Sequence, residues 1–187
     1  MLRQNPRTAP LFKATERFDP SDGDRWQKYI EWAKIPALTE IVGLDGMLCP
    51  TLLAEIEHDD WNHIVNESFR LDYFYDLDYL LGRVAGLSRR NILGLYRNPE
   101  AHIDLAPAAG GFEFLGYELI EEMTQISALT NCGGFPNSFS NVELNNYWLI
   151  CEFTRACAVR KSLALANPDE PHAQCEMYAI WRLNEKL

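Results

Sequence analysis

The chain has 187 residues, of which 47% are hydrophobic and 12% aromatic, and its formal net charge is −10. This composition is typical of one globular domain and argues against a disordered chain, which would be poorer in apolar residues. The apolar stretches are shorter than the roughly 20 residues that span a bilayer, and the first residues lack the apolar run of a signal peptide. We therefore expect a soluble protein.

The first quarter of the chain is predicted to hold an arm, a helix and a short strand. Prolines and a glycine punctuate residues 1–23, which we expect to form an N-terminal arm. Apolar residues at helical spacing predict a helix over 25–35, with Asp22 or Asp24 as its cap. A strand is expected over 39–44, before a turn-favouring Asp-Gly pair.

Three further helices are predicted next. Pro50 suits the first turn of a helix that runs to Ile56, and Asp59 or Asp60 is placed to cap the one that follows. The strongest helical pattern covers 73–84, where apolar residues recur at intervals of three and four.

Strands dominate the rest of the chain. We expect strands over 91–97, 112–120 and 126–130, the last two joined as a hairpin. The longest helix is predicted over 144–166. The strand pattern is most regular over 175–183, where successive residues alternate between two faces.

Helices come first, strands gather later, and there is no regular βαβ alternation. This order predicts an α+β fold in which an antiparallel or mixed sheet packs against several helices. No repeat or low-complexity segment divides the chain, so we expect a single domain over residues 24–187.

The cysteines indicate a reducing compartment. They are odd in number, scattered, and without a C-x-x-C pair, whereas secreted domains usually pair their thiols. We therefore expect a cytoplasmic protein whose cysteines are mostly small core residues. The five are Cys49, Cys132, Cys151, Cys157 and Cys175.

The negative charge is concentrated in one stretch. Residues 40–82 hold ten acids against Arg70 alone, which gives −9 of the total of −10. Such a field repels nucleic acids and anionic lipids and speeds the encounter with a cationic protein. The sequence therefore predicts a basic protein partner, with no nucleic acid and no membrane as ligand.

Residues 71–79 of this stretch form a block that combines three tyrosines and a phenylalanine with three aspartates. Exposed tyrosine rings among carboxylates are well suited to bind arginine and lysine side chains. The alternative is a solvated helix face without a partner, because charge runs often serve solubility. The predicted partner-binding residues are Glu55, Glu57, Asp59, Asp60, Asp72, Tyr75, Asp76, Asp78 and Tyr79.

Two short segments contain residue types that can carry chemistry. His58 and His63 flank two aspartates, but residues five apart diverge on a helix, so the aspartates are better interpreted as caps than as part of a metal site. Cys132 precedes a Gly-Gly pair, where a nucleophile could sit with His63, His102 or His172 as base. The simpler interpretation is a glycine turn. We expect no catalytic residues, no metal and no cofactor.

The runs FEFLGYELIEE and ISALTNCGGFPNSFSNVELN, followed by a helix and a tryptophan-containing strand, resemble a known group. The group consists of small bacterial proteins found beside polymorphic or contact-dependent toxins and regarded as immunity proteins. The resemblance covers about residues 25–183. It implies a cytoplasmic inhibitor that occludes a toxin's active site, and it carries over no functional residue.

Three functions therefore compete. The first is an acidic protein-binding module, an immunity-type inhibitor of a basic toxin or effector. The second is a small hydrolase that uses Cys132 or a metal bound by His58 and His63. The third is a self-associating structural subunit, since aromatic side chains are numerous. The sequence leaves the oligomeric state open.

Overall fold

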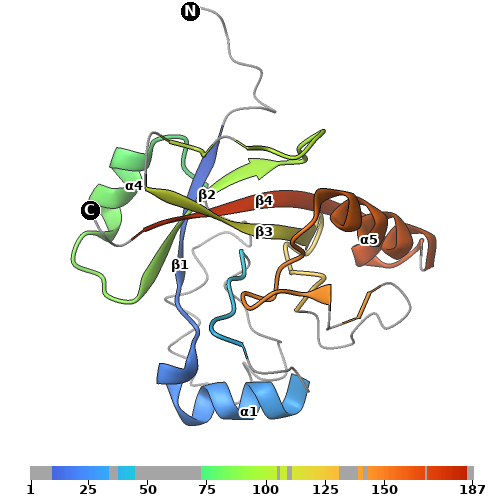
Figure 1. Ribbon diagram of the computed structural model, residues 1–187, viewed down its shortest axis with the longest axis horizontal. Coiled ribbons are helices and arrows are strands. Elements are labelled where there is room, and N and C mark those ends of the chain that lie inside the picture. The colour runs from blue at the N-terminus through green and yellow to red at the C-terminus, as the bar shows by residue number, and fades with distance from the viewer. Residues whose placement is uncertain are drawn as a thin grey trace, which may run out of the picture.

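A computed structural model describes residues 10–33, 38–44, 73–104, 106–108, 111–130, 139–140, 143–166 and 168–184, except for the side chains of Trp32, Ala33 and Arg83. The described residues form one antiparallel sheet in the order β1-β2-β4-β3 (Figure 1). Its strands are β1 (Leu11–Glu16), β2 (Arg90–Arg97), β3 (Phe112–Glu121) and β4 (Cys175–Leu183). The helices are α1 (Asp24–Ala33), α4 (Leu77–Val84) and α5 (Phe153–Ala166), with 3₁₀ turns η1 (Pro20–Asp22) and η3 (Pro171–Ala173). The predicted α+β fold is thus confirmed.

Strand β4 is the centre of the fold because both of its faces are covered. Its predicted bounds and its alternation of faces are both confirmed. On one face Met177 and Ala179 pack against the buried side of α5, where Val159 lies. On the other face Tyr178 and Ile180 pack among buried residues of β1 and β2. None of the described helices is both long and apolar enough to cross a bilayer.

Two predicted strands prove wrong. Residues 39–44 make only a single bridge, between Ile41 and Phe18, while neighbouring amides bond to the carbonyls of Asn146 and Tyr147. Residues 126–130 likewise return beside β3 through one bridge instead of a full strand. The first segment bonds mainly to the distant Asn146 and Tyr147, and the second bonds to β3 and to nearby hydroxyl oxygens. An alternating apolar pattern reveals neither arrangement.

The long C-terminal helix starts later than predicted. Helix α5 begins at Phe153, whereas we expected residue 144. The Asn145 side chain accepts the amides of Tyr147 and Leu149, and Ile150 pairs with Tyr117 at the outer edge of β3. These bonds give the backbone an alternative to helix, as asparagine side chains commonly do.

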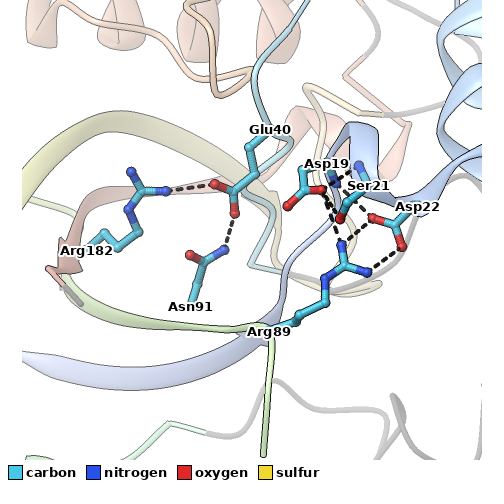
Figure 2. Close-up of polar contacts among 7 residues, drawn as sticks. All are labelled: Asp19, Ser21, Asp22, Glu40, Arg89, Asn91 and Arg182. Carbon is cyan, nitrogen blue, oxygen red and sulfur yellow. Dashed lines mark hydrogen bonds and ion pairs between the residues drawn. The ribbon is translucent and has the colours of Figure 1, made fainter. Parts of the chain in front are cut away.

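The N-terminal segment contributes to the sheet as well. Residues 11–16 of the predicted arm form β1, which pairs with β2 along its full length. Farther along, Asp19 caps η1 by accepting the Ser21 amide at 2.8 Å, and Asp22 accepts the Asp19 amide in return. Arg89 donates to both carboxylates and so ties this turn to the residue before β2 (Figure 2). Burial opposes ionisation of Asp19, but hydrogen bonds from Ser21 and the nearby Arg89 outweigh it and lower its pKa.

A buried carboxylate fastens the 38–44 segment to the sheet (Figure 2). Glu40, only 7% exposed, accepts one hydrogen bond from Asn91 on β2 and another, at 2.7 Å, from Arg182 on β4. Arg182 also donates to the Tyr147 hydroxyl and lies over that ring. A buried charge requires such partners, because its desolvation is costly when it stands alone.

Removing this carboxylate should destabilise the fold. We expect Glu40→Ala to lower the free energy of unfolding by about 3 kcal/mol, because the Arg182 guanidinium and the Asn91 amide lose a buried acceptor. Urea denaturation measures the change. Glu16→Ala is the matched control, since Glu16 forms an exposed pair with Arg90 at 3.4 Å and should cost less than about 1 kcal/mol. Equal losses in both variants would contradict the role of Glu40.

The cysteines only partly follow the expectation of a core position. Cys175 is buried on β4, but Cys151 and Cys157 are exposed, so the expectation is wrong for those two. Cys49 and Cys132 lie outside the described residues. Burial, and secondarily the charge of Glu121, raises the pKa of the Cys175 thiol to about 12.

Because of this shift in the Cys175 pKa, we expect the free energy of unfolding to fall at alkaline pH. The unfolded chain loses the Cys175 proton near the ordinary thiol pKa of 9.0, whereas the folded chain holds it to about 12, so stability should fall as pH rises through that window. Urea denaturation of the wild type and of Cys175→Ala, at about pH 8, about pH 9 and about pH 10, measures this effect. The variant should lose less stability over the upper part of this range. Parallel losses would show that other groups cause the effect.

Candidate functional site

The predicted partner-binding residues that the structure describes gather on and just before α4. This helix lies beside β1, an edge strand of the sheet (Figure 1). Asp76 caps it, because the Asp76 carboxylate accepts the amide of Tyr79 at 3.1 Å. Leu80 is the fully buried anchor of the helix, while Asp78 and Tyr79 on the same two turns are exposed.

The helix is shorter than predicted. We expected residues 73–84, but the helix begins at Leu77. Phe74 instead pairs in an extended conformation with Phe12 of β1 through two backbone hydrogen bonds of 2.7 and 2.8 Å. Tyr73 stacks on Tyr178 with ring centroids 5.8 Å apart. These contacts with the sheet outweigh the local helical preference of the segment.

Large apolar side chains are exposed here to an unusual extent. Tyr75 is 76% exposed, Tyr79 58%, Leu87 54% and Leu81 36%. These are four of the six exposed large hydrophobic side chains among the described residues. Clusters of this kind commonly mark protein interaction sites, whereas single exposed side chains do not. We call the exposed set the α4 surface: Tyr75, Asp76, Asp78, Tyr79, Leu81 and Leu87.

The sequence predicts part of this surface. It identified Tyr75, Asp76, Asp78 and Tyr79, which the structure brings together at one helix. It missed Leu81, because helical spacing groups this residue with the apolar stripe of Leu77 and Val84, and it missed Leu87, which lies beyond the end of the helix. The remaining predicted partner-binding residues fall outside the described part of the chain: Glu55, Glu57, Asp59, Asp60 and Asp72.

The two aspartates of the α4 surface differ in what they can do for a partner. Asp76 already uses one carboxylate oxygen to cap the helix, so it orders the backbone that carries Tyr79. Asp78 is exposed in the first turn, where its charge also complements the positive end of the helix dipole. Asp78 is therefore the carboxylate that is better placed to pair with an incoming cation.

The structure describes only some of the residues that we considered for hydrolysis. Cys132, His58 and His63 lie outside the described residues. His102 is held between two oxygens: its Nδ1 is 2.5 Å from the Tyr117 hydroxyl and its Nε2 is 3.2 Å from Asp104. Burial raises the pKa of Tyr117 to about 12, so this phenol keeps its proton at neutral pH.

The same cluster is best understood as a structural contact. The His102 ring meets Phe114 and Tyr117 edge-on, which fixes the loop after β2 against β3. His172 is buried in η3. Across the described segments, no three His, Cys, Asp or Glu side chains are grouped so that they could hold a metal ion.

No protein-family model matches the chain, and neither a curated protein nor a solved structure shows significant similarity to it.

Loss of the cap should loosen α4 specifically. We expect Asp76→Ala to cost about 1 kcal/mol of helix stability, because the Tyr79 amide loses its acceptor. Hydrogen exchange of the α4 amides, followed by mass spectrometry, should show faster exchange there and no change in β4. Asp78→Ala is the control, since it leaves the cap intact. Equal acceleration in both variants would show that charge near the helix N-terminus, not capping, controls α4.

Proposed function

We propose that this protein binds a basic protein partner through the α4 surface and inhibits it, in the manner of an immunity protein. The observation that carries this proposal is the exposure of Tyr79 and Leu81 beside Asp78 on α4, with exposed Tyr75 just before the helix and exposed Leu87 just after it. The fold makes little use of these side chains, since Leu80 is the buried anchor of α4.

The chemistry of the surface favours a cationic partner. Its rings and leucines supply apolar area that gains free energy when it is removed from water. Tyrosine rings also attract guanidinium and ammonium groups over their faces. The net charge of −10 adds long-range attraction that orients a basic protein before contact.

Inhibition follows from the same features. A partner that acts on anionic substrates, such as nucleic acid, needs a positive active-site surface. An acidic protein that covers such a surface competes with the substrate for the same charges. The resemblance of the chain to toxin-associated immunity proteins supports this form of the proposal.

Photo-crosslinking from the α4 surface tests the proposal. We expect a benzoylphenylalanine at position 79, in the cells that produce the protein, to capture one protein in which Lys and Arg outnumber Asp and Glu. The same reporter at Lys161, which is exposed on α5, is the control and should capture far less of it. The activity of the purified partner should be lost at one equivalent of this protein.

Association kinetics provide the second readout with that purified partner. Asp78→Lys and moderate salt should each slow association, because both weaken electrostatic steering. Crosslinking of position 79 to a second copy of this chain would instead indicate self-association. Capture of an acidic protein, or equal capture from Lys161, would refute binding at the α4 surface.

A further inference from the structure

The outward side of α4 has a glycine at its centre. Successive helical residues are rotated by about 100° around the axis. Leu77, Leu80 and Val84 face the protein, since Leu80 is buried and the other two are half-buried. Gly82 therefore lies on the opposite side, between Asp78 and Tyr79, and it is exposed.

Nothing within the described fold calls for glycine at this position. Gly82 has an ordinary helical backbone, and beyond its own helix and chain neighbours a Cβ atom there would meet no atom of the described residues within 4 Å. Two other glycines show the contrast. A Cβ on Gly94 would lie 2.4 Å from Pro107, and Gly116 combines a φ of +147° with a clash against Leu149. Glycine weakens a helix interior relative to alanine, so Gly82 disfavours the helix it occupies.

Glycine on an exposed helix face has one physical advantage, which is close approach of another backbone. Helices pack ridges of side chains into grooves, and a missing side chain deepens the groove at the crossing point. On α4 this open position is flanked by the ring of Tyr79 on one side and the carboxylate of Asp78 on the other.

We propose that Gly82 is the point at which an arginine- or lysine-bearing helix of the partner crosses α4. This inference rests on the proposed function and adds the form of the partner's binding element. The partner's backbone passes over Gly82, one of its basic side chains pairs with Asp78, and its apolar side chains cover Tyr79. The negative charge of the chain favours a basic helix over an acidic one.

A synthetic helix serves as the probe. It has about 18 residues, the length at which isolated helices become stable, and consists of alanine, leucine and arginine with the arginines along one side. A second peptide carries glutamate in place of each arginine. Calorimetric titration of the full-length protein should show binding of the arginine peptide only.

Substitutions at Gly82 then test the crossing point. Gly82→Leu should keep or raise the melting temperature, because leucine favours helix and the site is open, yet weaken peptide binding about tenfold by overpacking the contact. Gly82→Ala should also raise the melting temperature, and it should weaken peptide binding less than Gly82→Leu does. Ala158→Leu is the matched control, because it adds bulk on an exposed position of α5 and should bind like the wild type.

The outcomes separate this inference from the proposed function. Glu122→Lys, on the exposed turn after β3, is the control for Asp78→Lys. If Asp78→Lys weakens peptide binding more than this control does, the α4 surface is the binding site. If Gly82→Leu nevertheless binds the peptide as tightly as Ala158→Leu, the crossing point at Gly82 is wrong. If Asp78→Lys also has no effect, both ideas fail. Failure of the wild type to prefer the arginine peptide would refute a basic helix as the binding element.

Discussion

The fold depends on a strand that is covered on both faces and still carries charged side chains. Glu176 and Arg182 of β4 lie at the two ends of the face opposite α5, and both side chains are largely shielded from water. Glu176 pairs with Arg97 and accepts the Tyr178 hydroxyl, while Arg182 pairs with Glu40. Each pair joins β4 to a different segment, so the condition that buried charges be satisfied also fixes which segments meet.

The periphery follows a different rule. Helix α4 is held by the buried Leu80 and by the Phe12–Phe74 bridge that precedes it, and it leaves the side chains of Asp78, Tyr79 and Leu81 exposed. Within the described part of the chain only Leu80 of this helix is fully buried, so the Asp76 cap matters to its stability. The exposed side chains of Tyr79 and its neighbours are therefore available for contact with another molecule.

The sequence predicts those parts of the fold that have a strong local period. The alternation over 175–183 predicts β4 with correct bounds, because every residue of that strand packs on one face or the other. It does not predict that 39–44 and 144–152 avoid regular structure, since their hydrogen bonds reach across the fold. For the candidate site, the residue types of Tyr75 and Asp78 are informative, whereas their exposure depends on where α4 begins.

The exposure of the α4 surface also bears on how such a protein can evolve. Substitutions at Tyr75, Tyr79 or Leu87 alter side chains outside the two buried clusters, so they change the surface without opening cavities or stranding charges. The buried pairs of β4 are constrained in the opposite way, because a change in one partner is costly until the other changes as well. The α4 surface can therefore diverge through single substitutions while the sheet stays the same.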